Sequence, residues 1–264
     1  MTQDDALLTL TDDQLDRYSR HLVLREVGGS GQAKLLTAKV LVIGAGGLGA
    51  PLLQYLAAAG VGTIGIIDDD VVELSNLQRQ IIHTTDRTGT AKVTSAEMAI
   101  KALNPDVTVI SYQEKITPDN AADIISGFDI IADGCDNFKT RLLVSDTCVK
   151  LGRTLVSAAL GPFDGQLAVY KPHTSPDLPC YRCFVPSEPP ASENRTCADI
   201  GIIGALAGIM GSMQALEVIR EITGFSPSTA GKILFFDGMT LSSRLIKLPK
   251  DPACATCGKE AIKA

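Results

Sequence analysis

The sequence predicts an α/β fold built on one mixed β-sheet, and three observations support this prediction. Short apolar segments alternate with helical segments over residues 39–158, the pattern of parallel strands covered by helices on both faces. A glycine-rich turn follows the first of these strands. Two Cys-x-x-Cys pairs lie far apart in the second half of the chain. At 264 residues, 45% hydrophobic and 20% charged, the chain is long enough for one large domain or two small ones.

The predicted elements follow one another in a regular order. Strands are expected at residues 39–43, 63–67, 107–111, 129–132 and 154–158, and helices at 48–59, 91–103 and about 138–150. Gly60 ends the first helix, and Asn104-Pro105 ends the second. Beyond Gly161 the segments 166–171, 232–236 and 241–248 look like antiparallel additions to the same sheet. The predicted fold is therefore a Rossmann-like mixed sheet, with a parallel half followed by antiparallel strands.

Charge and hydropathy exclude two classes of partner. The net charge is −6, and no stretch clusters Lys and Arg as a nucleic-acid-binding surface requires. One membrane-like run, residues 200–216, ends at Glu217 and is spaced by three glycines, Gly204, Gly208 and Gly211. We expect it to be a buried helix, packed through its glycines against the core or a second subunit, and not a membrane span. No secretory signal is expected, because acidic residues stand near the N-terminus.

The two cysteine pairs, Cys180/Cys183 and Cys254/Cys257, predict a structural zinc site. Two thiolates three positions apart can bind one metal ion, and two such pairs complete the tetrahedral sulfur shell that suits Zn²⁺. Disulfides or a redox pair are the alternatives, but the odd number of remaining cysteines favours a reducing compartment, the cytoplasm. Residues 173–199, which contain the first pair, are expected to form a mobile surface crossover pinned by the metal.

The glycine-rich turn, Gly44-Ala-Gly46-Gly47-Leu-Gly49, predicts a phosphate-binding site. The first glycine permits the tight turn, the second lets backbone approach a phosphate, and the last lets the helix pack close to the sheet. Asp68 follows the next strand about twenty residues on, where a carboxylate can accept hydrogen bonds from ribose hydroxyls. Taken alone, this fingerprint suits an NAD-dependent oxidoreductase equally well.

Polar residues beyond the second strand favour a triphosphate over a nicotinamide. Asn76, Arg79 and Gln80 follow that strand. Lys92 stands in the first turn of a predicted helix, where a cation costs about 0.3–1 kcal/mol against the helix dipole and a bound polyphosphate would reverse that cost. A solvated surface lysine is the alternative for Lys92. Asn76, Arg79 and Lys92 supply the charge and fixed donors that a triphosphate needs.

Asp136 is the candidate ligand for Mg²⁺. It follows the predicted strand 129–132 at the carboxyl edge of the sheet, where open α/β folds bind ligands, and Mg²⁺ on nucleotide phosphates needs only one or two protein oxygens. Helix capping is its alternative role, and Asp136 and Asn137 could divide the two tasks. Asp70 is a second candidate for the metal.

In this order, the motifs resemble the MoeB/ThiF/HesA family, bacterial relatives of ubiquitin-activating enzymes. The resemblance rests on residues 44–49, Asp68-x-Asp70, residues 74–80, Lys92, Cys135-Asp136-Asn137 and both cysteine pairs. It implies ATP-dependent adenylation of the C-terminal Gly-Gly carboxylate of a ubiquitin-like sulfur carrier of the MoaD/ThiS type, with release of pyrophosphate. It assigns the ribose to Asp68, the phosphates to Asn76, Arg79, Gln80 and Lys92, and the magnesium to Asp136.

The resemblance also implies two further residues and two further partners. Arg20 matches the family position whose guanidinium reaches the ATP of the neighbouring subunit, which implies a homodimer. Cys197 matches a crossover cysteine that receives or relays sulfur in some relatives. Because no sulfurtransferase segment follows Cys257, we expect the sulfur donor to be a separate protein such as a cysteine desulfurase or a rhodanese.

We therefore expect a single domain over residues 1–264. It would comprise an N-terminal helical segment to about residue 35, an ATP-binding half over 36–160 and a carrier-binding half over 161–264. The predicted function is that of a carrier adenylyltransferase serving molybdopterin, thiamin or related sulfur transfer. Two alternatives remain: an NAD-dependent oxidoreductase, which hydride transfer would reveal, and a non-catalytic zinc-stabilised scaffold, which Mg²⁺-dependent nucleotide binding would exclude.

Overall fold

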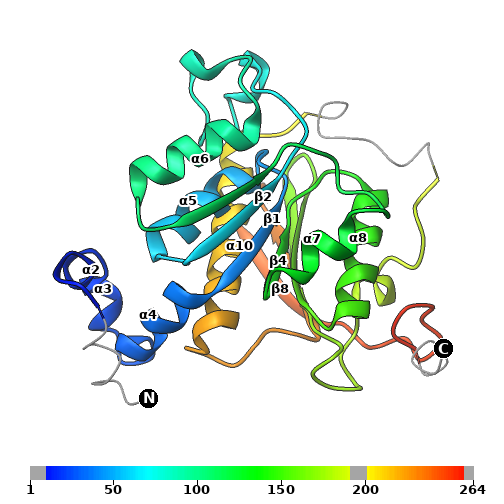
Figure 1. The fold of residues 1–264 in the computed structure, drawn as a ribbon. Coiled ribbons are helices and arrows are strands. Elements are labelled where there is room, and N and C mark those ends of the chain that lie inside the picture. Colours follow the sequence, from blue (N-terminus) through cyan, green and yellow to red (C-terminus); the bar gives the residue numbers. More distant parts are fainter. Residues whose placement is uncertain (1–9, 191–200, 259–264) are drawn as a thin grey trace.

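The fold is built around an eight-stranded sheet with strand order β3-β2-β1-β4-β5-β6-β7-β8 (Figure 1). The structure, a computed structural model, describes residues 10–190 and 201–258. The strands are β1 (Lys39–Ile43), β2 (Thr63–Ile67), β3 (Thr108–Tyr112), β4 (Ile130–Asp133), β5 (Thr154–Leu160), β6 (Asp164–Tyr170), β7 (Lys232–Asp237) and β8 (Ser242–Lys247). β1 to β5 pair in parallel, and β6 to β8 continue the sheet in antiparallel. The predicted mixed sheet is confirmed.

The helices agree with the sequence pattern wherever they are long. They are α2 (Asp12–Arg17), α3 (Ser19–Leu22), α4 (Gly28–Thr37), α5 (Gly49–Ala59), α6 (Lys92–Leu103), α7 (Ala121–Ser126), α8 (Phe138–Leu151) and α10 (Gly204–Thr223), with 3₁₀ turns η1 (Leu74–Asn76), η2 (Thr85–Arg87) and η3 (Tyr181–Cys183). The prediction missed α7, because its 6 residues are too few to show a helical period.

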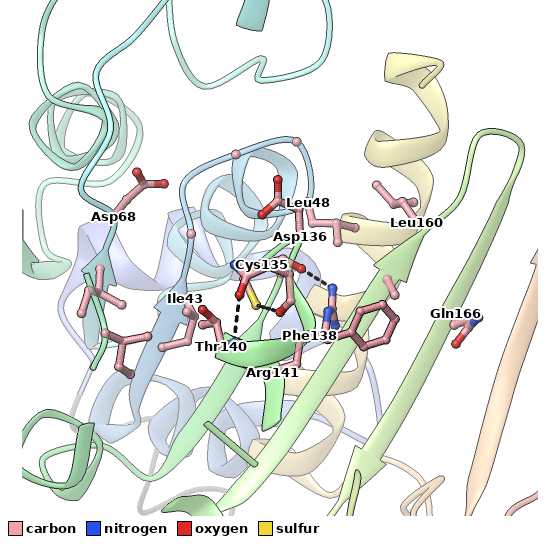
Figure 2. A pocket seen from close by; sticks show the side chains of 18 of the residues that line it. Ile43, Leu48, Asp68, Cys135, Asp136, Phe138, Thr140, Arg141, Leu160 and Gln166 are labelled. Carbon is pink, nitrogen blue, oxygen red and sulfur yellow. Dashed lines mark hydrogen bonds between the residues drawn. The ribbon is translucent and has the colours of Figure 1, made fainter. Parts of the chain in front are cut away.

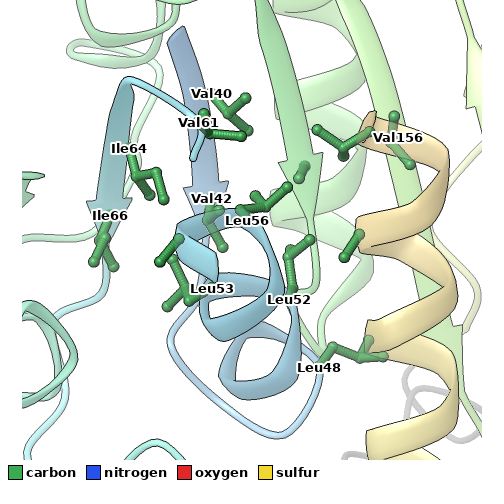
Figure 3. Close-up of a cluster of buried hydrophobic side chains, with 14 of the residues drawn as sticks. Val40, Val42, Leu48, Leu52, Leu53, Leu56, Val61, Ile64, Ile66 and Val156 are labelled. Carbon is green, nitrogen blue, oxygen red and sulfur yellow. The ribbon is translucent and has the colours of Figure 1, made fainter. Parts of the chain in front are cut away.

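Alternate residues of the central strands build the two faces of the core. Val40 and Val42 point towards α5, α6 and α10, where they pack with Leu52 and Leu56 (Figure 3). Leu41 points to the opposite face, which α7 and α8 cover. The period of two along a strand thus gives the three-layer arrangement expected of a sheet buried on both sides.

The strand order places a crevice at the carboxyl ends of β1 and β4. β1 lies between β2 and β4, so the chain leaves β1 on one side for β2 and returns on the other side for β4. The loops that follow β1 and β4 meet at this point, and the amide of Gly134 donates to the carbonyl of Ile43 at 3.2 Å. Open α/β folds bind ligands at such a reversal of strand order.

The apolar run after residue 200 is a buried helix, as predicted, although α10 continues past Glu217 to Thr223. A Cβ atom at Gly211 would overlap the carbonyl oxygen of Leu48 and lie 2.6 Å from Pro51 Cγ, so α10 packs closely on α5 there. Gly204 is similarly close to the carbonyl of Gln78, whereas a Cβ at Gly208 would meet nothing within 4 Å. Gly208 therefore makes no close contact among the described residues, and its packing against a second subunit stays a prediction. None of the described helices has the length and apolar content of a membrane span.

We predict that Gly211→Ala lowers the free energy of unfolding by about 1–3 kcal/mol, because the new methyl group overpacks the contact between α10 and α5. Gly208→Ala, on the same helix, is the matched control. It should leave stability unchanged or raise it by up to about 1 kcal/mol, since alanine is the better helix former. Urea denaturation of both variants measures the difference, and equal losses would contradict the packing described.

Candidate active site

The glycine-rich turn joins β1 to α5 and leaves its backbone open on one side. Gly44 has φ +91°, in the left-handed region that favours glycine. A Cβ at Gly49 would overlap the carbonyl oxygen of Gly44, so the turn cannot tolerate a side chain there. A Cβ at Gly46 would meet only Gln80 Nε2, at 3.8 Å. The turn is therefore tightly packed on the side of Gly49 and accessible on the side of Gly46, where the first amides of α5 can bind an anion.

The peptide group of Ala45, inside this turn, is held on both sides. Its N–H donates to Asp68 Oδ2 at 2.8 Å, and its carbonyl lies 3.0 Å from His83 Nε2. The other Asp68 oxygen accepts the amide of Asp70 at 2.9 Å. Burial raises the pKa of the Asp68 carboxyl, while Lys92 and these two amide hydrogen bonds act in the opposite direction. Asp68 thus orients the turn while facing the crevice (Figure 2).

Lys92 is the first residue of α6 and is only 5% exposed. Its Nζ lies 2.9 Å from Asp70 Oδ2, and the Asp70 side chain is 65% exposed. The alternative of a solvated surface lysine is therefore wrong. A buried cation at the positive end of a helix requires a counter-charge, and Asp70 supplies it here. Carboxylate oxygens of Asp68, Asp69 and Asp70 lie within 4.8 Å of one another, a spacing that could hold a metal ion, so Asp70 stays the second candidate for the metal.

The three polar residues after β2 line the same crevice. Asn76 Oδ1 accepts a hydrogen bond from the backbone amide of Glu73 at 3.3 Å and so stabilises the η1 turn. Asn76 Nδ2 donates one of its two hydrogens to Ser75 Oγ at 3.4 Å. Arg79 donates to the carbonyl of Ser75 at 3.2 Å. Gln80 is 4% exposed, and its Oε1 has no hydrogen-bond partner among the described residues. An orphaned buried polar atom beside an open glycine turn fits a site that receives a polar ligand.

The loop after β4 is shaped by a buried ion pair that the sequence analysis missed. Asp133 is fully buried, and Arg141 of α8 donates to its Oδ2 at 3.3 Å and to Ser157 Oγ at 3.0 Å. The same guanidinium donates to the carbonyl of Cys135 (Figure 2) and to that of Ala158. Arg141 therefore fixes the path of residues 133–137 through its bonds to Asp133 and to the Cys135 carbonyl.

Asp136 and Asn137 take different positions at the end of this loop. Asn137 is the N-cap of α8, because its Oδ1 accepts the amide of Thr140 at 2.9 Å. Asp136 is exposed and lines the crevice. Capping therefore falls to Asn137, and the Asp136 carboxylate faces the open space. The neighbouring Cys135 thiol is held neutral, because burial raises its pKa well above the usual value.

The crevice is an open cavity of about 1100 Å³ that gathers nearly all the predicted ligand-binding residues. They are Gly44, Gly46, Gly47, Asp68, Asp70, Asn76, Arg79, Gln80, Lys92, Asp136 and Asn137. A second arm of the same cavity is lined by Ala159, Leu160, Gly161, Gln166, Phe184 and Val185. Pockets for one small molecule usually measure roughly 300–1,000 Å³. This cavity has room for a second group beside a nucleotide.

The four cysteines of the two pairs converge at the far end of α8. Their sulfur atoms all lie within 4.8 Å of one another, with 3.6 Å between Cys180 and Cys254 and 3.5 Å between Cys183 and Cys257. Tetrahedral zinc with Zn–S bonds of about 2.3 Å requires sulfurs about 3.8 Å apart. All four are free thiols, so the disulfide alternative is wrong. The donor set and its spacing fit one structural zinc ion.

Asp146 of α8 anchors both cysteine pairs. Its carboxylate accepts from Arg182 Nε at 2.8 Å and Nη2 at 2.7 Å, and from Thr256 Oγ1 at 2.8 Å. Arg182 lies inside the first pair and Thr256 inside the second. One carboxylate therefore holds the two halves of the cluster against the helix that begins at the crevice.

The ThiF family model matches residues 18–256. This chain belongs to the ThiF family. It is 49% identical over 251 residues to the Bos taurus protein named adenylyltransferase and sulfurtransferase MOCS3, covering 95% of this chain and 54% of that protein. It is 43% identical over 252 residues to the Thermus thermophilus protein named sulfur carrier protein adenylyltransferase, covering 95% of this chain and 93% of that one.

Solved structures share the ThiF fold described here. Escherichia coli MccB with ATP superposes with a TM-score of 0.80 at 21% identity, covering 97% of this chain and 85% of that one. At this level of identity the likeness concerns the fold alone. The chain spans about half the length of MOCS3 and nearly the full length of the Thermus relative.

Arg20 and Cys197, the two further residues that the ThiF family resemblance implies, stand differently in the structure. Arg20, on α3, is exposed and is not among the residues that line the cavity. Cys197 lies outside the described residues. The crevice therefore contains every predicted nucleotide-binding residue except Gly49, which lies beneath the turn.

We predict that Cys254→Ala loses stoichiometric zinc and lowers the melting temperature by about 5–10 °C, because the metal joins residues 180–183 to residues 254–257. Cleavage by proteases within residues 173–190 should increase. Cys148→Ala, which removes a buried thiol of α8 outside the cluster, is the control and should retain one zinc per chain. Elemental analysis of the parent protein that finds no bound metal would contradict this assignment.

Proposed function

We propose that this chain uses ATP to adenylate the C-terminal Gly-Gly carboxylate of a ubiquitin-like sulfur carrier protein. The observation that carries the proposal is the single cavity in which the glycine turn, Arg79, Lys92 and Asp136 face an adjoining arm. Two relatives support it: the Thermus thermophilus protein named sulfur carrier protein adenylyltransferase, at 43% identity, and the Haloferax volcanii protein named SAMP-activating enzyme E1, at 42% identity.

The triphosphate would lie over the glycine turn. Gly46 and Gly47, which precede α5, line the cavity, where their amides would donate to phosphate oxygens. Arg79 and Lys92 add positive charge. Lys92 would exchange its bond to Asp70 for a phosphate oxygen, which keeps the buried cation neutralised. Asn76 Nδ2 has one hydrogen left to donate to the same ligand, and the side-chain NH₂ group of Gln80 can also donate to it.

Asp68 would hold the ribose. Its two oxygens already accept the amides of Ala45 and Asp70, but each keeps a further lone pair for a ribose hydroxyl. Asp136 would supply the carboxylate for Mg²⁺, which neutralises phosphate charge during nucleotidyl transfer. Its exposure towards the cavity and its freedom from helix capping fit that role.

The carrier tail would lie in the second arm of the cavity. Two small residues, Ala159 and Gly161, line this part of the cavity beside Phe184, which suits two glycines without side chains. A carboxylate oxygen of the tail attacks the α-phosphorus, the bond from that phosphorus to the bridging oxygen breaks, and pyrophosphate carries away the electron pair. Preorganised donors on the phosphates stabilise the charge that develops in this step.

The remaining parts of the proposal follow the ThiF family. Residues 36–160 form the ATP-binding half and residues 161–264 the carrier-binding half of one domain, preceded by a helical segment to about residue 35. Arg20 completes the site of a neighbouring subunit in a homodimer, and a separate protein donates sulfur. Cys197 acts after adenylation, in sulfur transfer, since adenylation itself needs no enzyme thiol. Free thiols at the metal cluster suit a reducing cytoplasm.

We predict that Lys92→Ala and Arg79→Ala each reduce carrier-dependent ATP–pyrophosphate exchange by about 10²–10³-fold, the usual effect of removing one preorganised donor from a developing charge. Lys139→Ala is the charge-matched control, because Lys139 is exposed beside the crevice but does not line it. Exchange in the Lys92 or Arg79 variant within about threefold of the parent would be incompatible with the proposed phosphate site.

We predict that Arg20→Ala and Asp136→Ala chains are each inactive in exchange but recover part of the activity when mixed. In a mixed dimer the Arg20→Ala chain keeps its own Asp136 and receives Arg20 from its partner, so one of the two sites is complete. Native mass spectrometry verifies that subunits exchange. Absence of recovery in verified mixed dimers would rule out a shared site.

A further inference from the structure

His83 belongs to none of the predicted motifs, yet its ring joins two phosphate-facing elements. The residue is 5% exposed. Its Nε2 lies 3.0 Å from the carbonyl oxygen of Ala45 in the glycine turn, and its Nδ1 lies 2.9 Å from Ser95 Oγ in α6. Ser95 is fully buried and stands three residues after Lys92 on the same helix.

The partners of the ring fix its protonation. A carbonyl oxygen only accepts, so Nε2 carries a hydrogen and donates to Ala45. In the neutral ring Nδ1 then accepts, and the Ser95 hydroxyl donates to it. Burial lowers the pKa of His83; the hydrogen bond to Ala45 acts in the opposite direction, and the nearby cations Lys92 and Arg87 lower the pKa further. The net lowering favours this neutral form.

We propose that His83 is a positioning residue that locks the glycine turn to α6, so that the Gly46 and Gly47 amides and the Lys92 ammonium face one phosphate group together. This inference rests on the proposed ATP site. Asp68 already holds the N–H of the Ala45 peptide, and His83 holds its carbonyl, so that peptide cannot rotate. The amides that follow are therefore oriented before any ligand arrives, which reduces the ordering that binding requires.

The test compares ATP binding by calorimetry among four variants of the full chain. His83→Leu keeps the bulk but removes both hydrogen bonds, and it should raise the dissociation constant for ATP by about ten- to hundredfold. His83→Gln can donate to Ala45 through its amide and should stay within about fivefold of the parent. Ser95→Ala removes only the Nδ1 partner and should fall between these two.

Glu217→Leu is the matched control for lost stability. Glu217 is 8% exposed and accepts from Arg220 and Thr229, so its replacement also removes two part-buried hydrogen bonds. It lies about 20 Å along α10 from the Gly204 contact, at 1.5 Å per residue, and does not line the cavity. The Glu217→Leu chain should bind ATP with the same affinity as the parent. An equal loss in this control, or a folded His83→Leu chain with parental affinity, would overturn the inference.

Nitrogen-15 NMR of the free chain tests the clamp without nucleotide. We expect a neutral His83 ring with its hydrogen on Nε2, and faster hydrogen exchange of the Ala45 amide, which donates to Asp68, in His83→Leu than in His83→Gln. A hydrogen on Nδ1, or equal exchange in the two variants, would contradict the clamp. A parent chain that binds no ATP would refute the proposed function, and these NMR results would still decide whether His83 holds the turn.

Discussion

The steric constraint at the turn between β1 and α5 governs the whole site. The chain must reverse between Ile43 and Gly49, and the last glycine lies directly on the carbonyl of Gly44. This contact leaves the peptide of Ala45 inside the fold, where an unpaired N–H or carbonyl would cost about 1–3 kcal/mol. Asp68 and His83 satisfy both groups. The open face of the turn is thus a consequence of how its buried face is packed and bonded.

Two ion pairs around this turn have different degrees of burial and different consequences. Asp133 and Arg141 are both buried, and both Nη groups of the guanidinium are used by one carboxylate, one hydroxyl and two carbonyls. This pair therefore acts as a fixed part of the loop after β4. Lys92 is buried but its partner Asp70 is exposed. A charge paired with an exposed carboxylate can change partners without becoming uncompensated, which suits a site that receives an anion.

The sequence predicts those features whose cause is local. Strand and helix periods predict the sheet, glycine spacing predicts the turn, and the paired cysteines predict the cluster of four thiols. His83, Arg141 and Asp146 were missed, because each acts through partners that the fold brings together. Asp146 and Thr256, for example, are separated by 110 positions in the sequence, and nothing in the sequence indicates their contact. Asn76 was assigned only to a ligand, whereas its side chain also caps the η1 turn.

A crystal structure of the chain with Mg²⁺ and a non-hydrolysable ATP analogue tests the account most directly. The account predicts phosphate oxygens about 2.7–3.2 Å from the Gly46 and Gly47 amides, with Lys92 Nζ moved from Asp70 to a phosphate and the His83 contact to Ala45 unchanged. Phosphates bound elsewhere, with the Lys92–Asp70 pair intact, would contradict the claim that the glycine turn and α6 form one preformed phosphate site.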